Sequence, residues 1–336
     1  MISSGRPLVD VIMVTYNHEK YISQAIESVL CQKCNFNIRL IIGEDSSTDR
    51  TGDICEYYAK LYPEKILLLR NPINFGLIKN YKEVFNHCSA KYVAILEGDD
   101  YWTDEYKLTK QINILEQDES IGLVFTNYSV LYEDGSMKLG ISPLQKTWES
   151  KIFNDLLMLK RSGPAPLTSC FRLDLVKEFF DFNFCIQQNC HTLDFSLWLE
   201  LSYHKQFMYI PDNTATYRII RTAITQTLDI NKINKYNEDN KKVIEYYINR
   251  YSDLKINKKE LIDNYKYQII KNYLSKGFYL EAKKESRDLN NKKLKTFLIL
   301  LASNNKVFCL AYIYLIKFLS NIKQIFYKMY IFFIRK

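Results

Sequence analysis

The chain has 336 residues, of which 47% are hydrophobic and 25% charged, the usual proportions of a globular protein. These proportions exclude wholesale disorder and a collagen-like fibre, and the length predicts one large domain with a smaller appendage, or two domains. The net charge is +8, but nine basic residues and no acidic ones follow Asp288. Since the first 288 residues then carry a net charge of −1, we expect no nucleic-acid partner.

Two further features indicate a cytoplasmic protein. Residues 1–17 lack the basic start and long apolar run of a secretory signal peptide and are expected to lead into the first strand. The 8 cysteines are scattered, as in compartments that keep thiols reduced. Cys31 and Cys34 form one CxxC pair without a second, so we interpret them as residues of the core rather than as zinc ligands.

Short apolar runs alternate with longer amphipathic segments over the first 126 residues, a pattern typical of a parallel α/β sheet. The runs predict strands at 8–14, 38–43, 65–70, 91–96 and 121–126. The segments between them predict helices at about 19–31, 50–62, 77–88 and 104–117. We expect Thr48 and Thr103 to cap two of these helices. Ligands of such sheets bind beyond the carboxyl ends of the strands.

The second half of the chain is less regular. Residues 127–225 contain a turn-rich loop at 163–169 and a helical stretch around 193–203, and we expect them to complete the sheet and one wall of a cleft. Residues 231–290 are rich in Lys, Asn and Glu with helical periodicity, which predicts a helical extension. Residues 291–336 predict a basic amphipathic helix.

Polar residues follow three of the predicted strands: Thr15-Tyr16-Asn17, Glu44 to Asp49, and Glu97 to Trp102. These clusters resemble motifs of the family 2 glycosyltransferases, which have the GT-A fold. The similarity extends over about residues 8–225 and is carried by VDVIMVTYNHEKYI, IIGEDSSTDRT, the Asn74-x-Gly76 loop with Asn80, ILEGDDYW and TLDFSLWLEL. The pair EDSSTDRT and EGDDYWTD resembles especially the bacterial enzymes that build capsule, O-antigen or other surface polysaccharides.

The resemblance implies an α/β fold of GT-A type, with a Rossmann-like, mixed and mainly parallel sheet flanked by helices and a C-terminal helical extension. The expected domains are a glycosyltransferase domain at 7–225, a helical extension at 231–290 and a membrane-associating helix at 291–336. Within the first, residues 7–105 form the half that binds the nucleotide sugar and residues 106–225 the half that binds the acceptor.

Glu97, Asp99 and Asp100 are the expected metal ligands. A nucleotide sugar leaves behind a diphosphate whose developing charge needs a divalent cation, and Mg²⁺ or Mn²⁺ prefers hard carboxylate oxygens. The resemblance places these residues at the so-called DXD motif, where Asp99 also contacts the donor. The alternative is an acidic turn after a strand.

Further residues are expected to bind the nucleotide-sugar donor, which we expect to be a UDP-sugar. Asp45 resembles the carboxylate that accepts a hydrogen bond from the uracil imide, with Glu44 beside it and with Val14 and Tyr16 around the base. The alternative for Asp45 and for Asp49, favoured for Asp49, is that they only cap the following helix.

Other candidate donor contacts lie outside these motifs. Lys79 and Asn80 follow the Asn74-x-Gly76 loop, and Arg218 resembles the Arg of a Tyr-Arg-x-His segment that folds over the diphosphate. Ile220 replaces that histidine, so only Arg218 or Arg221 remains to neutralise phosphate charge, the alternative being a surface salt bridge.

Asp194, in TLDFSLW, is the candidate catalytic base. It resembles the family aspartate that opens the acceptor-side helix and takes the proton of the acceptor hydroxyl as that oxygen attacks the anomeric carbon. The common Glu-Asp pair is Leu193-Asp194 here, and the catalytic member is the one retained. The alternative is a solvated aspartate at a helix N-terminus.

The C-terminal segment has an uninterrupted apolar run of only 10 residues, Val307 to Ile316, whereas a membrane span needs about 20. One helical face carries basic and polar residues, which predicts a helix lying in the plane of an anionic membrane surface. These residues are Lys306, Lys317, Ser320, Asn321, Gln324, Lys328 and Arg335. A helix buried against the protein and a true span are the alternatives. We expect a cytoplasmic enzyme held peripherally at the inner face of the cell membrane.

Together these features predict an inverting, metal-dependent glycosyltransferase that moves a sugar from its donor to a hydroxyl of a lipid-linked saccharide. Two other classes stay open: a sugar nucleotidyltransferase, and a non-catalytic membrane-bound protein that binds or assembles saccharides. The sequence does not specify the sugar, the linkage or the oligomeric state.

Overall fold

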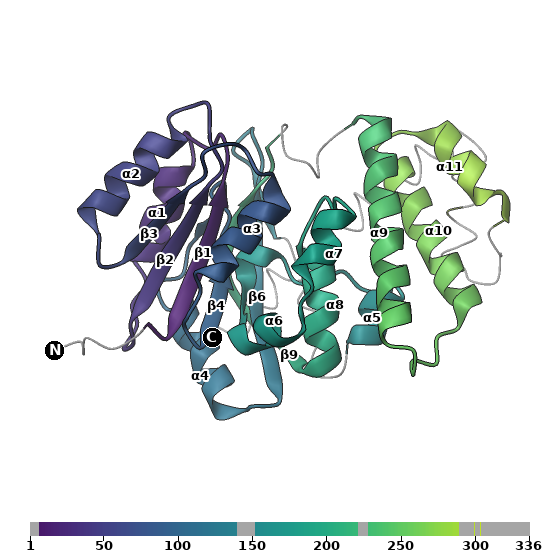
Figure 1. Ribbon diagram of the computed structural model, residues 1–336. Helices are drawn as coiled ribbons and strands as arrows, with labels where there is room; N and C mark the ends of the chain where they lie inside the picture. Colours follow the sequence, from purple (N-terminus) through teal and green to yellow (C-terminus); the bar gives the residue numbers. More distant parts are fainter. Residues whose placement is uncertain (1–6, 140–151, 221–227, 289–298, 300–302, 304–336) are drawn as a thin grey trace, which may run out of the picture. The chain divides into compact units, whose positions relative to one another are not determined.

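A computed structural model describes residues 7–139, 152–220, 228–288, 299 and 303 (Figure 1). The chain divides into two compact units. The first comprises residues 1–153 with 163–224, and the second comprises residues 154–162 with 225–336.

The first unit is built on a mixed sheet whose longest ladders are parallel. The described strands are β1 (Val9–Thr15), β2 (Ile38–Glu44), β3 (Ile66–Arg70), β4 (Tyr92–Ile95), β5 (Tyr101–Trp102), β6 (Ile121–Leu131), β7 (Met137–Leu139), β8 (Ser169–Arg172) and β9 (Gln206–Arg218). Their order across the sheet is β3-β2-β1-β4-β8-β6-β9-β5, and β7 pairs with β6. Strands β3, β2, β1 and β4 run parallel, whereas β8 is antiparallel to both of its neighbours. The mixed, mainly parallel sheet is thus confirmed.

Helices flank this sheet, as predicted. They are α1 (Ile22–Leu30), α2 (Thr51–Leu61), α3 (Leu77–Asn86), α4 (Lys107–Gln117), α6 (Leu173–Phe179), α7 (Phe182–Gln187) and α8 (Asp194–His204), with the short turn η1 (Pro166–Thr168). In α1 the buried residues Ile22, Ala25, Ile26 and Val29 recur at helical spacing and form its inner face. Figure 1 shows α1 and α2 on one face of the sheet and α3 on the other.

The expected helix caps were wrong. Arg50 and Tyr106 occupy the N-cap positions of α2 and α4, and neither side chain makes a capping bond. Asp49, for which helix capping was the favoured alternative, accepts from the N–H of Thr51 at 2.9 Å through Oδ1, but its Oδ2 also accepts from the Glu19 N–H at 3.1 Å, so capping is not its only role. The backbone N–H of Thr103 instead donates to the carbonyl of Thr214.

The cysteine interpretation was partly wrong. Cys31 is exposed just after α1 and Cys34 is half-buried, so Cys31 does not belong to the core. Among the described residues, the cysteines are free thiols and none joins a group that could hold a metal ion.

The second unit is helical, as the predicted extension requires. Its elements are α9 (Ile230–Arg250), α10 (Lys258–Ser275), α11 (Tyr279–Glu285) and η3 (Ser286–Asp288), and α5 (Phe153–Leu157) lies at the boundary between the units. Its core includes Ile233, Ile270, Tyr273, Leu274 and Ala282. The segment 154–162 belongs with these helices unexpectedly, since Gln268 donates to the Leu159 carbonyl and Lys160 pairs with Glu260.

No helix in the described part of the chain is long and apolar enough to cross a membrane. The predicted basic helix at 291–336 lies outside the described residues, apart from positions 299 and 303. Its membrane association therefore stays a prediction.

Lys107 is fully buried at the start of α4. Its ammonium donates to Gln111 Oε1 at 2.7 Å and lies 4.4 Å from the centre of the Trp102 ring. Gln111 in turn donates to the carbonyls of Val124 and Thr168, so the group joins α4 to the sheet. Burial lowers the pKa of Lys107 to about 7.

This buried lysine predicts a pH-dependent contribution to stability. Above pH 7 the native state loses the Lys107 proton, whereas the unfolded chain keeps it until about pH 10.4. The unfolded state then binds more protons, so this group makes the free energy of unfolding rise by about 2 kcal/mol between pH 7 and 9. Lys107→Met should lack this rise. Urea unfolding of both proteins at pH 7, 8 and 9 measures the difference, and a constant difference would contradict the prediction.

Candidate active site

Three neighbouring parallel strands, β2, β1 and β4, end at the same edge of the sheet and deliver the polar clusters there. The turn after β4 carries Glu97, Gly98, Asp99 and Asp100 and packs directly on β1, since the Gly98 N–H donates to the Val14 carbonyl at 3.1 Å. A Cβ at Gly98 would lie 2.6 Å from Thr15 Oγ1. Glycine is therefore the residue that allows the acidic turn to approach the sheet so closely.

The carboxylates of Glu97, Asp99 and Asp100 form a cluster, with one oxygen from each within 4.8 Å of the others. Asp100 is fully buried; its Oδ1 accepts from the Arg218 backbone N–H at 2.8 Å, and its Oδ2 has no hydrogen-bond partner. Burial, and then the charge of Asp99, raise the pKa of Glu97 to about 8 and that of Asp100 well above its usual range. A buried carboxylate oxygen without a partner, among mutually repelling carboxylates, fits Mg²⁺ or Mn²⁺.

Arg218 braces this acidic turn. Its guanidinium carbon lies 5.1 Å from the centre of the Tyr21 ring and 4.4 Å from that of Tyr101. The guanidinium also donates to the Asp99 carbonyl at 2.5 Å and to Gln24 Oε1. Arg218 is 8% exposed, so it is not the surface salt bridge considered as an alternative, and its contacts within the protein fix the shape of the turn.

Asp194 is the first residue of α8, and the structure brings it to the acidic cluster. Its negative charge contributes to raising the pKa of Glu97 and of the Tyr81 hydroxyl. Burial raises the pKa of Asp194 itself. A carboxylate with a raised pKa beside a metal site is a candidate proton acceptor.

Tyr16 and Asp45, two of the residues predicted to surround the nucleobase, lie on adjoining loops that follow β1 and β2. Tyr16 is 43% exposed, whereas Val14 is buried in β1. Asp45 is buried as well, and it does not cap α2. Its Oδ1 accepts from Asn71 Nδ2 and from the Phe75 N–H, both at 2.8 Å, and its Oδ2 accepts from the Gly76 N–H at 2.9 Å. Asp45 thus holds the loop that leads into α3.

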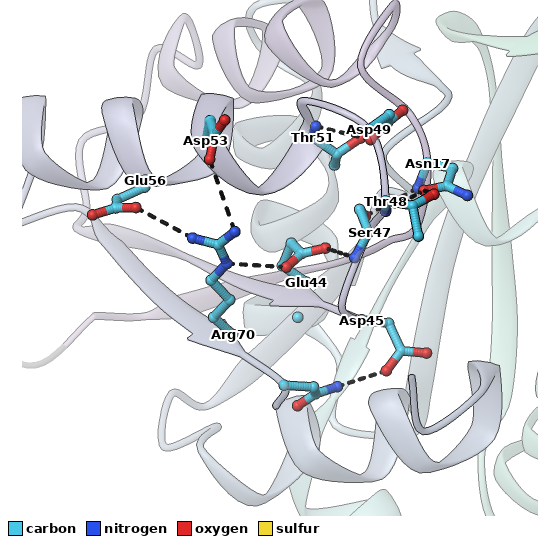
Figure 2. A network of polar contacts seen from close by, with 12 residues as sticks. Asn17, Glu44, Asp45, Ser47, Thr48, Asp49, Thr51, Asp53, Glu56 and Arg70 are labelled. Atoms are coloured by element: carbon cyan, nitrogen blue, oxygen red, sulfur yellow. Dashed lines mark hydrogen bonds and ion pairs between the residues drawn. The ribbon is translucent and has the colours of Figure 1, made fainter. Parts of the chain in front are cut away.

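The other predicted donor contacts are placed differently. Asn80 is buried: its Nδ2 donates to the Gly43 carbonyl at 2.8 Å and its Oδ1 accepts from Asn71, so it fastens α3 to β2. Lys79 is exposed on α3 and stays a prediction. Glu44 points to the opposite side from Asp45, toward Arg70 (Figure 2).

Sequence reasoning missed two residues of the site. Tyr81 donates its hydroxyl to Glu97 Oε1 at 2.9 Å, joining α3 to the acidic cluster. His18 Nδ1 lies 3.1 Å from Thr15 Oγ1, and burial lowers the pKa of its ring while Asp99 opposes that shift. His18 lies within the first motif and Tyr81 directly follows Asn80. The sequence feature that could have identified both residues is therefore their closeness to motif residues.

The mixed, mainly parallel sheet with its flanking helices is the GT-A fold. Two solved structures share the fold. Staphylococcus aureus TarS 1-349 has a TM-score of 0.50 and 16% sequence identity, and the match covers 88% of this chain and 91% of TarS 1-349. The Pyrobaculum calidifontis mannosyltransferase PcManGT has a TM-score of 0.52 and 13% sequence identity, and the match covers 96% of this chain and 89% of PcManGT. The model of glycosyl transferase family 2 matches residues 10–178, just over half of the chain. The chain belongs to this family.

Curated relatives match over shorter stretches. The uncharacterized protein Rv1520 of Mycobacterium tuberculosis is 34% identical over 45% of this chain and 43% of its own length. The putative teichuronic acid biosynthesis glycosyltransferase TuaG of Bacillus subtilis is 32% identical over 46% and 61%. The Escherichia coli glucosyltransferase WfaP is 34% identical over 37% and 46%. The chain thus spans less than two thirds of the length of each.

Proposed function

We propose that this chain is an inverting, metal-dependent glycosyltransferase that transfers a sugar from a UDP-sugar to a hydroxyl of a lipid-linked saccharide during surface polysaccharide biosynthesis. The observation that carries the proposal is the cluster of Glu97, Asp99 and Asp100, whose buried Asp100 Oδ2 has no protein partner. Asp194 lies near enough for its charge to act on Glu97. A site for a divalent cation next to a candidate base provides both functions of the proposed transfer, stabilisation of the leaving group and removal of the acceptor proton.

In this mechanism Asp194 accepts the proton of the acceptor hydroxyl while that oxygen forms the new bond to the anomeric carbon. The bond from the anomeric carbon to the diphosphate oxygen breaks on the opposite face, so the configuration at the anomeric carbon is inverted. Asp100, Asp99 and Glu97 would hold Mg²⁺ or Mn²⁺, which when bound neutralises the charge developing on the diphosphate. Tyr81 and Arg218 keep the acidic turn in place through their bonds to Glu97 and Asp99.

The relatives support the donor and acceptor classes. WfaP is a glucosyltransferase for UDP-Glc that acts on a GlcNAc-diphosphoundecaprenol, which is a lipid-linked saccharide. TuaG is assigned to teichuronic acid biosynthesis. Structures of the fold neighbours hold UDP-GlcNAc in TarS and GDP-Man with Mn²⁺ in PcManGT, so a GDP-sugar is included in the test. A lipid-linked acceptor also fits the proposed attachment to the inner face of the cell membrane through residues 291–336.

The test is nucleoside diphosphate release by the purified full chain from a panel of UDP-, GDP- and dTDP-sugars, with and without Mn²⁺ or Mg²⁺. We expect metal-dependent release from one donor, through slow hydrolysis even without the acceptor. Binding without release would indicate that the lipid-linked acceptor is required. Failure to bind any nucleotide sugar would overturn the proposal and favour a saccharide-binding or assembly protein.

A further inference from the structure

The last residue of β2 and the residue after it point to opposite faces of the sheet. A Cβ on Gly43 would lie 2.5 Å from Asn80 Oδ1, and Asp45 bonds the Gly76 N–H, so residues 43 and 45 both face α3. Side chains alternate along a strand, and Glu44 therefore faces α2 (Figure 2). This places the Glu44 carboxylate away from Asp45 and from the loop that Asp45 binds.

Glu44 is fully buried and its charge is matched by Arg70. Its Oε1 accepts from the Ser47 N–H at 2.6 Å, and its Oε2 lies 3.4 Å from Arg70 Nε. The two residues are register partners at the ends of β2 and β3. Because an unpaired buried carboxylate is strongly unfavourable, the ion pair with Arg70 stabilises the Glu44 side chain in this position.

Besides Glu44, the Arg70 guanidinium contacts two acidic residues in the first turns of α2. Its Nη1 lies 3.3 Å from Glu56 Oε2 and its Nη2 lies 3.9 Å from Asp53 Oδ1. The guanidinium crosses directly over Gly52, where a Cβ would lie 2.6 Å from Nη2. The loop at 45–50 connects β2 to α2, so the Glu44–Arg70 pair holds both ends of that loop.

The loop held in this way is joined to the loop after β1. The Asn17 N–H donates to Ser47 Oγ at 3.0 Å, and Asn17 Oδ1 accepts from the Thr48 N–H at 2.9 Å. Asn17 and Ser46 have φ angles of 56° and 59°, in the left-handed region that non-glycine residues seldom adopt. Such conformations persist only where the surroundings impose them. The pair of loops carries Tyr16 and Asp45, which the sequence predicts to bind the nucleobase.

We infer that Glu44 and Arg70 are positioning residues for the donor nucleobase: they contact no donor and instead hold the joined loops in the geometry that binds it. The inference rests on the proposed function, and it replaces the direct donor contact predicted for Glu44. A preorganised binding site gains affinity because less ordering is required on binding. Loss of the pair should therefore weaken donor binding without changing the reacting groups, which lie in the turn after β4 and on α8.

The test compares Arg70→Met, Arg70→Lys and Glu44→Gln with the unaltered full chain. The probe is whichever of UDP, GDP and dTDP binds the unaltered chain most tightly. For Arg70→Met we expect the Kd of this nucleotide and the KM of the donor to rise about tenfold or more. The kcat at saturating donor should change by less than about twofold. Arg70→Lys keeps the charge and should recover part of the affinity. The double variant Glu44→Gln/Arg70→Met should be less impaired than the product of the single effects.

Lys60→Met is the matched control, because Lys60 lies on α2 and pairs with Glu56 at 2.6 Å on the surface without contacting Glu44. It should leave Kd unchanged. An unaltered Kd in both Arg70→Met and Glu44→Gln would overturn the inference while leaving the proposed function standing, as would a fall in kcat with unchanged KM. If the unaltered chain binds none of the three nucleotides, both fail. Should Arg70→Met not fold, Arg70→Lys and Glu44→Gln decide the question.

Discussion

Asp100→Asn should reduce metal-dependent nucleoside diphosphate release by at least about 10²-fold while raising the thermal stability of the protein. Asparagine keeps the Oδ1 that accepts from the Arg218 N–H, so the turn should retain its shape. In place of Oδ2, the oxygen without a partner, it puts an amide nitrogen that cannot ligate a cation. Stabilisation of the leaving group by a metal is worth several kcal/mol, and 1.36 kcal/mol corresponds to about tenfold in rate.

Stability should change in the opposite direction because the substitution removes a buried, repelled carboxylate. The pKa of Asp100 is raised well above its usual range by burial and by Asp99, so its charged form disfavours folding. Thermal unfolding with and without Mn²⁺ measures both effects. Mn²⁺ should raise the Tm of the unaltered protein, since it binds only the folded state, and it should not raise that of Asp100→Asn.

The control for Asp100→Asn is Glu116→Gln, which neutralises an acid on α4 whose partner, Lys91, is a surface residue. Its activity and its response to Mn²⁺ should equal those of the unaltered protein. Full turnover by Asp100→Asn, with an undiminished Mn²⁺ response, would remove Asp100 from the metal site.

The parallel half of the fold was predictable because parallel strands are buried on both faces and read as continuous apolar runs. Strands β1 to β4 lie within two residues of their predicted bounds. The antiparallel half gave less signal. Strand β8 has only four residues and begins inside the turn-rich loop at 163–169, and β9 contains Pro211 and three shifts in its register with β6. The segment 154–162 joins the second unit through contacts with α10, which no local pattern reports.

The site was predictable as a set of positions and less so as a set of contacts. Motif order indicated the acidic turn and Asp194, which the structure brings together. The roles of Asn80 and Arg218 depend on partners 37 and 119 residues away, the carbonyls of Gly43 and Asp99. Such long-range pairs are set by packing, and a sequence does not display them. The opposed directions of Glu44 and Asp45 follow from strand alternation once the end of β2 is known.

Asp194→Asn should lower kcat by about 10²–10⁴-fold, the range expected for loss of a positioned proton acceptor, and should leave donor binding and the Mn²⁺ response unchanged. Asparagine is equally suited to a helix N-terminus, so α8 should form as before. Because burial raises the pKa of Asp194, the unaltered enzyme should lose activity as the pH falls through that raised pKa, above the range of an ordinary aspartate. The kcat of both proteins across pH, with the Kd of the donor nucleotide, tests this.

Asp181→Asn distinguishes catalysis from a helix-terminal role. Asp181 precedes α7 and accepts from the N–H groups of Asn183 and Phe184 at 2.9 and 3.1 Å, so it is a capping aspartate of the same protein. If Asp194 only stabilised its helix, the two variants would show similar small losses of Tm and similar, nearly full activity. If Asp194 is catalytic, the kcat values of the two variants should differ at equal donor saturation. Asp181→Asn should then have nearly the kcat of the unaltered protein, and Asp194→Asn a kcat at least about 10²-fold lower.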